Sequence, residues 1–295
     1  MPISEAAIPM THWGYRRSDV TYDVVSVHDG NFFRLDDHIN RFRASMNTLR
    51  MHPRETDEEI KQILDRLVRL AGLKASYVAM DCLRATPLPG MPRLPQYTPC
   101  YIAAFAVPWV NLVTDEMYER GVHMIIAKES RRIPVECVEP RVKNFHWGDL
   151  TRAQFEAADR GAEFAVLLDF EGNITEGAGF NVFSITDGKV ATPIRGALDG
   201  ITRKSVIELC GMLGIPCEVR KVSAQEFLDA DEIFMCTTAG GIMPVSRIDG
   251  RIMNNDRPGP ISMKLKEAFW AERARGWHAT PVDYSKTDDL AAIAA

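Results

Sequence analysis

The sequence predicts an α+β protein built from two α/β units. Its 295 residues are enough for one large domain or two modest ones. In both halves, short runs of β-branched and aromatic residues alternate with stretches whose apolar residues recur at helical spacing. Between the halves, residues 128–140 carry several charges and two prolines, a composition typical of a linker. We therefore expect one compact unit on each side of this segment.

The composition indicates a globular protein with a sizeable core. It contains 46% hydrophobic and 25% charged residues, and its net charge of −5 argues against binding to nucleic acid or to an anionic membrane surface. The longest mostly apolar run, residues 101–110, is too short to cross a bilayer, and residues 1–15 lack the pattern of a signal peptide. The six cysteines form no CxxC pair and lie at no metal-ligand spacing from a histidine. We expect free thiols, no metal site and a cytoplasmic location.

The first half begins with a predicted β-hairpin followed by two helices. Residues 20–28 are β-branched and aromatic and run into the Asp-Gly pair at 29–30, which is a strong hairpin signal. Asp36 is the expected cap of the first helix, and the capping-box pattern at residues 56–59 starts the second. The apolar stripe of the first helix consists of Ile39, Phe42, Met46 and Leu49.

Three more strands are expected before the linker, at residues 77–84, 100–107 and 122–127. The segment between the first two, residues 87–95, is too rich in proline for regular structure. A long irregular loop of this kind often lines or covers a site.

The second half begins with a predicted helix at residues 149–160 and a buried strand at 164–169. A turn leads into residues 174–183, where small residues surround Glu176 and allow backbone or ligand to approach closely. A glutamate in such a neighbourhood needs a cationic partner, although on its own it could equally be an exposed turn residue. The Asp-Gly pair at 187–188 predicts another hairpin.

Two later segments are suited to binding an anion. Residues 196–205 place glycines before a helix that runs to about Leu213, so the N–H groups of its first turn are available. The sequence TTAGG at 237–241 follows a predicted strand at 231–236 and offers hydroxyl and N–H groups. The helix start is not a P-loop, because the GK[ST] ending is missing.

Lys143 completes a set of groups with a common use. It precedes aromatic residues and a helix start, so its amine could be partly buried, which would make it a nucleophile or base. Composition alone would leave it an ordinary surface lysine. Together, however, a lysine amine, a carboxylate and two anion-binding segments are what pyridoxal 5′-phosphate requires. They supply a Schiff base, a partner for the pyridine nitrogen and ligands for the phosphate.

Six blocks of the sequence resemble the class IV aminotransferases, the fold-type IV pyridoxal-phosphate enzymes that include branched-chain and D-amino acid aminotransferases. Within that group the chain is most similar to the (R)-selective amine transaminases. The resemblance extends from about Trp13 to Tyr284. The blocks are SDVTYDV (18–24), FRLDDHINRF (33–42), VKNFHWGDL (142–150), EGAGFNV (176–182), GITRKSV (200–206) and CTTAGGIMP (236–244).

The resemblance implies a role for each matched residue. Lys143 would form the Schiff base and shuttle the α-proton, Glu176 would pair with the pyridinium nitrogen, and Leu198 would pack against the ring. The implied phosphate ligands are Arg41, Ile201, Thr202, Thr237 and Thr238. The implied substrate-pocket residues are Arg17, Tyr22, Val24, Leu83, Arg131 and Trp147.

The resemblance also implies the D-amino acid aminotransferase-like fold and a homodimer. We expect a small α/β domain at residues 1–130, a linker at 131–140 and a larger cofactor-binding domain at 141–295. The expected reaction is ping-pong transfer of an amino group from an (R)-amine or amino acid to a 2-oxo acid.

Two departures from the family pattern leave the amino donor open. Arg17 stands where the (R)-amine transaminases often have histidine, and Leu83 stands where threonine is expected. An Arg-x-His carboxylate clamp of the D-amino acid kind is not visible. Branched-chain or D-amino acid transamination and an aminodeoxychorismate-lyase-type elimination therefore remain alternatives.

Overall fold

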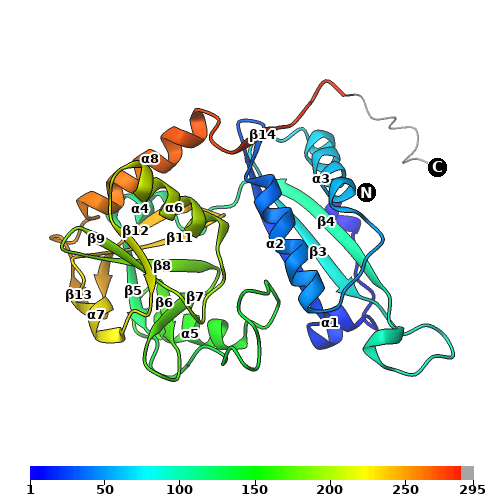
Figure 1. The fold of residues 1–295 in the computed structure, drawn as a ribbon, viewed down its shortest axis with the longest axis horizontal. Coiled ribbons are helices and arrows are strands. Elements are labelled where there is room, and N and C mark those ends of the chain that lie inside the picture. The colour runs from blue at the N-terminus through cyan, green and yellow to red at the C-terminus, as the bar shows by residue number, and fades with distance from the viewer. Residues whose placement is uncertain (287–295) are drawn as a thin grey trace. The chain divides into compact units, whose positions relative to one another are not determined.

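The computed structural model describes residues 1–286, which divide into two compact units (Figure 1). The first unit contains residues 1–110, 142–145 and those from 278 onward. The second contains residues 111–141 and 146–277.

This division differs from the predicted boundaries at 130 and 141. Residues 111–130 belong to the second unit, because strand β5 (Val122–Ile126) is hydrogen-bonded into that unit's sheet. Residues 142–145 belong to the first unit, because Lys143 and Asn144 pair with strand β1 (Val20–His28). The composition gives no signal for either assignment, because each depends on hydrogen bonds between residues far apart in the chain.

The first unit is a five-stranded sheet covered on one face by two helices. The sheet order is β14-β2-β1-β3-β4. Its other strands are β2 (Asn31–Phe33), β3 (Ser76–Arg84), β4 (Cys100–Pro108) and β14 (Ala279–Pro281). The covering helices, seen in Figure 1, are α2 (Leu35–Thr48) and α3 (Asp57–Ala71). Shorter helical segments are η1 (Ile3–Glu5), α1 (Trp13–Arg17) and η2 (Pro95–Tyr97).

Local sequence signals account for the start of this unit. Asp29 and Gly30 both have positive φ, 48° and 73°, as the two central residues of a type I′ hairpin turn require. Thr56 and Glu59 form the predicted capping box at the start of α3. The predicted cap of α2 was wrong. Arg34 occupies that position with φ 54°, and Asp36 lies inside the first turn, because the left-handed backbone at Arg34 turns the chain two residues earlier.

The two faces of this sheet carry different residues. The helix-covered face packs against α2 and α3 in one apolar core, whose sheet residues include Val25, Val27, Val78, Met80 and Cys82. Side chains alternate along a strand, so the neighbours of these residues lie on the other face. We call this second surface the open face. On β1 and β3 it comprises Val20, Tyr22, Val24, Ser26, His28, Tyr77, Ala79, Asp81 and Leu83.

The second unit is built on a nine-stranded sheet that closes into a barrel. Strand β7 pairs with both β6 and β8, so the path β8-β11-β12-β5-β6-β7 returns to its start, and apolar side chains fill the core. Its other strands are β6 (Phe164–Leu168), β7 (Ile174–Gly177), β8 (Phe180–Thr186), β9 (Lys189–Pro193), β10 (Cys217–Arg220), β11 (Glu232–Thr237), β12 (Gly241–Ile248) and β13 (Arg251–Ile252).

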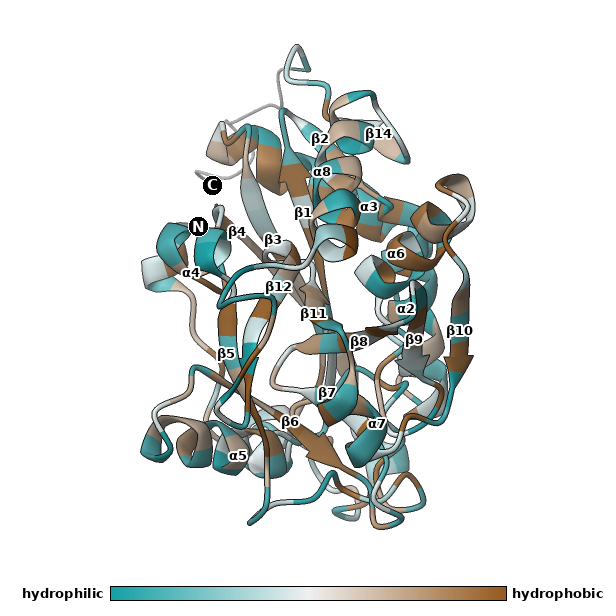
Figure 2. Cartoon of the chain, turned by 90° about the vertical axis from the view of Figure 1, so that its left-hand side faces the viewer, coloured by the Kyte–Doolittle hydropathy of each residue, from teal (hydrophilic) through white to brown (hydrophobic). Residues whose placement is uncertain are grey.

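Helices pack around this barrel. They are α4 (Asp115–Arg120), α5 (Gly148–Asp159), α6 (Ile201–Met212), α7 (Ala224–Asp229) and α8 (Pro260–Ala274). Strand β6 is brown along its length in Figure 2, as expected of a strand whose five residues are all buried. Among residues 1–286, no helix has the length and apolar character needed to cross a membrane.

Candidate active site

The backbone of Lys143 is anchored to the first unit by three hydrogen bonds. Its carbonyl accepts from Thr21 Oγ1 at 2.7 Å and from the N–H of Tyr22 at 3.0 Å. Its own N–H donates to Ser45 Oγ at 3.3 Å. These bonds come from β1 and α2, so the position of the lysine is set by the sheet and helix rather than by its own loop.

The side chain of Lys143 lies against Tyr22, a residue predicted to line the substrate pocket. Its Nζ is 4.4 Å from the centre of the Tyr22 ring, a cation–π distance. Phe145 meets the same ring edge to face at 5.0 Å. Lys143 is half-buried, as its aromatic surroundings predict. The amine of Lys143 therefore lies beside the Tyr22 side chain of β1.

Arg41, the predicted phosphate ligand, is held by a fully buried carboxylate. Its Nε and Nη2 donate to Asp23 Oδ2 and Oδ1, each at 2.8 Å. His38 Nδ1 lies 2.7 Å from Asp23 Oδ1, and the N–H of Val24 donates to the same oxygen at 2.7 Å. Burial alone would raise the pKa of Asp23, but the charges and hydrogen bonds of Arg41 and His38 hold it well below its usual range. The guanidinium is therefore fixed in orientation.

Asp23 and His38 were not predicted as site residues. Both lie inside the matched blocks SDVTYDV and FRLDDHINRF, and His38 comes one helical turn before Arg41. That helical spacing was the available signal for His38, because it places His38 beside Arg41. Asp23 had no such signal, since its side chain points to the opposite face from Tyr22.

In the second unit, Glu176 has the cationic partner that its burial requires. Its Oε1 accepts from Nε and Nη2 of Arg132 at 3.2 and 3.1 Å, and its Oε2 accepts from the N–H of Leu198 at 2.9 Å. Arg132 Nη1 also donates to Asp149 Oδ2 at 2.6 Å. Both Glu176 and Arg132 are 6% exposed. This chain of charges fixes the carboxylate and brings Leu198 beside it.

Arg132 was not predicted as a site residue, whereas its neighbour Arg131 was predicted to line the substrate pocket. Arg131 is exposed and donates to backbone carbonyls of its own segment, including that of Ala127 at 3.2 Å. Successive side chains in an extended segment point to opposite sides, so only one of the two arginines can face Glu176. The sequence holds no signal that distinguishes them.

The residue after Glu176 must be glycine. A Cβ at Gly177 would overlap the ring of Phe180 and lie 2.6 Å from the carbonyl oxygen of Ala165. The close approach inferred from the small residues of this segment is thus made by the barrel's own backbone and core.

The predicted phosphate ligands of the second unit lie at one helix start and one strand turn. Helix α6 has Gly200 as its N-cap with no side-chain cap, so the first N–H groups, including those of Ile201 and Thr202, have no acceptor within the helix. Thr237 and Thr238 lie half-buried where β11 turns into β12, and α6 packs against β11. A helix N-terminus with adjacent hydroxyl groups suits a phosphate dianion.

Gly200 is also required by packing. A Cβ there would overlap Asn181 Oδ1, and Asn181 Nδ2 donates to the carbonyl of Leu198 at 2.9 Å. Asn181 therefore ties the segment before α6 to β8, a role that sequence reasoning did not assign.

The other predicted pocket residues are distributed as follows. Val24 and Leu83 are each 5% exposed on the open face, where Leu83 packs against the backbone of Gly14. Arg17 is exposed, and its guanidinium lies 3.7 Å from the centre of the Trp13 ring.

Trp147 belongs to the second unit, where it precedes α5. Its ring approaches Gly179. It therefore stands beside the EGAGFNV segment that carries Glu176.

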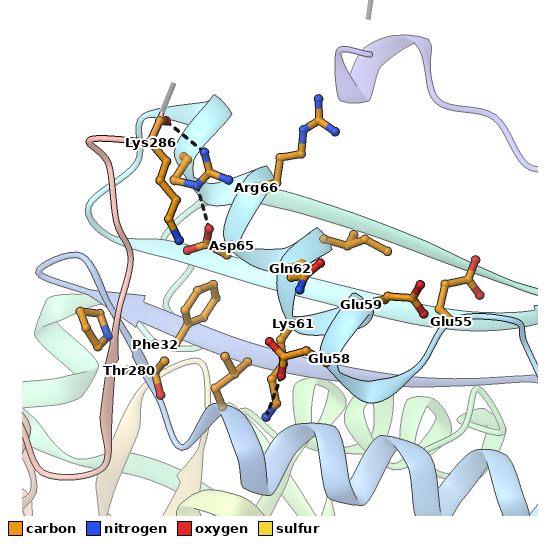
Figure 3. A pocket seen from close by; sticks show the side chains of 14 residues that line it. Phe32, Glu55, Glu58, Glu59, Lys61, Gln62, Asp65, Arg66, Thr280 and Lys286 are labelled. Carbon is orange, nitrogen blue, oxygen red and sulfur yellow. Dashed lines mark hydrogen bonds and ion pairs between the residues drawn. The ribbon is translucent and has the colours of Figure 1, made fainter. Parts of the chain in front are cut away.

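A groove of about 750 Å³ runs along α3 in the first unit, as Figure 3 shows. Its charges pair with one another, as in the ion pairs Lys61–Glu58 at 3.8 Å and Arg69–Asp65 at 2.7 Å. None of the residues predicted for the site lines it. The groove is therefore separate from the residues predicted for the active site.

The groups in the two units fit pyridoxal 5′-phosphate. The first supplies an anchored lysine and a fixed guanidinium, and the second supplies a carboxylate paired with an arginine and an uncapped helix start. The family model described as amino-transferase class IV matches residues 21–248, a range that includes both sets. The chain belongs to the class IV aminotransferases. These enzymes use pyridoxal 5′-phosphate, and the fold is fold type IV.

This class IV aminotransferase is similar to several named amino acid aminotransferases. It is 29% identical over 240 residues to the branched-chain-amino-acid aminotransferase of Salmonella typhimurium, covering 81% of this chain and 77% of that protein. It is 27% identical over 275 residues to the D-alanine aminotransferase of Bacillus licheniformis, covering 91% and 93%. The branched-chain amino acid aminotransferase of Thermobaculum terrenum in its PLP form superimposes with a TM-score of 0.85 and 28% identity, covering 96% of this chain and 95% of that one.

Proposed function

We propose that this class IV aminotransferase moves an amino group from an (R)-amine, or from an amino acid that the same pocket accepts, to a 2-oxo acid in two half-reactions. One observation carries the choice of an amine donor. The side chains of the open face on β1 and β3 include no arginine or lysine, and the one histidine, His28, is the last residue of β1, six positions from Tyr22. A cationic side chain is the strongest partner for the carboxylate of an α-amino acid, whereas an amine donor without a carboxylate needs no such partner.

The residues divide the work between binding and proton transfer. When bound, the cofactor supplies an aldehyde that takes up the amino group and a ring that accepts the electron pair left at the donor's α-carbon. Lys143 Nζ would hold the aldehyde carbon before the donor arrives and then move the α-proton as general base and acid. The carboxylate of Glu176, paired with Arg132, would keep the pyridine nitrogen protonated.

Two sets of residues would bind the phosphate. Arg41 would donate hydrogen bonds from a guanidinium that Asp23 already orients. Ile201 and Thr202 would donate from the first turn of α6, and the Thr237 and Thr238 hydroxyl groups would complete the ligand set. Leu198, whose backbone is held by Glu176, would cover the ring.

Two further proposals accompany this function. By family resemblance we propose that the chain acts as a homodimer, which sedimentation of the purified protein would test. We also propose a cytoplasmic location, on the basis of its six cysteines, all of which are free thiols in the structure.

Substitution of Lys143 by alanine tests the central role. We expect amino transfer from (R)-1-phenylethylamine to pyruvate to fall by about 10²–10⁴-fold or more, the usual contribution of a general base. Lys74→Ala is the matched control, because Lys74 also lies over a tyrosine ring, at 3.0 Å from Tyr284, but outside the predicted site. Full turnover in Lys143→Ala would refute the proposed mechanism.

A donor panel distinguishes the alternatives. (R)- and (S)-1-phenylethylamine, D-alanine and L-leucine would be compared with pyruvate or 2-oxoglutarate as acceptor, with parallel double-reciprocal lines expected for ping-pong transfer. A strong preference for L-leucine or D-alanine would favour the amino acid activities of the named relatives. Release of pyruvate from aminodeoxychorismate would instead indicate the lyase.

A further inference from the structure

A carboxyl group lies in the middle of the predicted substrate pocket on the open face. Asp81 on β3 is directly opposite Tyr22 on β1 in the antiparallel register. Directly opposed residues point to the same side of a sheet, with Cβ atoms roughly 4.5–5.5 Å apart. Asp81 is also two positions from Leu83 and diagonal to Val24, which pairs with Ala79. Three predicted pocket residues thus surround it.

The immediate surroundings of Asp81 are apolar or aromatic. Across the other edge of β3 its partner is Ala103 on β4, and the next residue along the open face of β4 is Phe105. Burial raises the pKa of Asp81 to about 6, with no nearby cation to oppose the shift. Among residues 1–286, no hydrogen bond or ion pair reaches its carboxyl group, in contrast to Asp23 on the opposite face.

We propose that Asp81 selects amino donors that carry a second cationic group at their far end, such as α,ω-diamines, over donors that carry a carboxylate there. The inference rests on the proposed function, since it takes Lys143 as the point where the donor amine reacts. Lys143 Nζ lies over the Tyr22 ring, and Asp81 is the cross-strand neighbour of Tyr22. A donor bound along this face would therefore present its distal end to the carboxyl group.

The charge balance of the face favours this assignment. A half-buried carboxylate without a partner is costly, and a bound ammonium group would remove that cost. Arg17, the cationic residue predicted for the pocket at this end of the sheet, is exposed and lies on the Trp13 ring, so water screens its field. The 2-oxo acid that accepts the amino group must accordingly place its carboxylate away from Asp81.

The half-reaction with a diamine balances without another reagent. The terminal CH2–NH2 of the donor becomes an aldehyde, CHO, while the cofactor aldehyde becomes CH2–NH2. The donor carbon is oxidised by two electrons and the cofactor is reduced by two. The distal ammonium group takes no part in this exchange, so it can serve only for recognition.

Three donors of equal length isolate the effect of the distal group. Cadaverine, pentylamine and δ-aminovalerate share a five-carbon chain and end in an ammonium, a methyl and a carboxylate group. With the cofactor-saturated enzyme and pyruvate, we expect kcat/KM for cadaverine to exceed that for δ-aminovalerate by about tenfold or more, as expected for a charge-assisted contact. In Asp81→Asn, this preference should disappear, while the pentylamine value stays within about twofold of wild type.

Two further variants keep the test decisive. Asp81→Glu retains the charge and should retain the preference for cadaverine. This variant still tests the proposal if Asp81→Asn fails to fold. Asp36→Asn removes one exposed negative charge from the same unit and should leave the ratio unchanged. A cadaverine-to-pentylamine ratio that Asp81→Asn does not alter would overturn the proposal. So would an equal loss for all three donors, which would indicate a structural role.

Failure of the proposed function would look different. If the wild-type enzyme transfers an amino group from none of these donors nor from the amines and amino acids of the wider panel, the transaminase proposal fails and the substrate inference fails with it. If transfer occurs but its donor preference does not depend on Asp81, only the substrate inference is refuted.

Discussion

The two faces of the small sheet each carry a carboxyl group, and the pKa values of these two groups are shifted in opposite directions. On the helix-covered face, Asp23 is fully buried and accepts hydrogen bonds from Arg41, with His38 in contact. On the open face, Asp81 is half-buried among apolar and aromatic side chains. The pKa of Asp23 is held well below its usual range, whereas that of Asp81 is raised to about 6.

Burial therefore does not by itself decide what a carboxyl group does here. Where the helix supplies a cation, the carboxylate becomes a rigid support for Arg41, which is suited to holding a cofactor that stays bound. Where no cation is supplied, the carboxyl group remains able to respond to whatever binds next to it, which is suited to recognising a substrate that comes and goes.

Removing the charge of Asp23 should give the largest effect. Asp23→Asn leaves Arg41 without its counter-charge on the buried face, which typically costs about 3–5 kcal/mol of unfolding free energy. Unfolding in guanidinium chloride measures this loss of unfolding free energy. The loss should be smaller with pyridoxal 5′-phosphate bound, because the phosphate would compensate Arg41 in part.

The exposed ion pair of Asp36 with Lys61 provides the control for that experiment. Asp36→Asn should cost no more than about 1 kcal/mol, since its side chain is 73% exposed. If Asp23→Asn were as mild as this control, the buried network would not be the support for Arg41 that its geometry suggests.

Asp81→Asn should change the free energy of unfolding less than Asp23→Asn does. It should stabilise the protein, and the gain should depend on pH. The folded-state pKa of Asp81 is raised, so folding favours the protonated form, and this contribution is complete below about pH 4 and lost as pH rises through about 6. The Asn variant should match wild type near pH 4 and exceed it by roughly 2–3 kcal/mol near pH 8. Unfolding curves across this range, without amine, measure the difference.

A gap that stays constant with pH would contradict this picture. It would mean that the carboxyl group already has a cationic partner in the assembled protein, for example from a second copy of the chain. The comparison between the two faces would then hold only for the single chain.

The hydroxyl group that holds Lys143 should have the smallest effect. Thr21→Val removes one of two hydrogen bonds to the Lys143 carbonyl and keeps the shape of the side chain, so we expect a loss of about 1 kcal/mol. Because the N–H of Tyr22 still donates to that carbonyl, kcat should fall only about two- to fivefold.

Thr48→Val is the matched control for Thr21→Val. Its hydroxyl also donates to a backbone carbonyl, that of Ala44 at 3.0 Å, but on the exposed surface of α2. An equal change in kcat in both variants would show that the hydroxyl of Thr21 does not position the lysine.

Local elements were predictable because their signals are local. The hairpin at 29–30, the capping box at Thr56 and the helix at the start of GITRKSV each depend on a few adjacent residues, and each lies where the pattern indicated. Pairings between distant segments had no such signal. Strand β14 at the edge of the small sheet pairs with β2 nearly 250 residues earlier in the chain (Ala279 with Phe33). The residues near either strand do not indicate this pairing.

The sequence by itself determined the chemistry: an amine at Lys143, a carboxylate at Glu176 and an uncapped helix start at Gly200, in an order that resembles one family. Only the tertiary structure decided which groups neutralise one another. It paired Glu176 with Arg132, which was not predicted for the site. It also gave Asp23 an arginine and a histidine as neighbours while giving Asp81 neither. The physical reason is that residue type fixes what a side chain can donate or accept. Its charge state and partner depend on solvent exclusion and on contacts with segments that come together only when the chain folds.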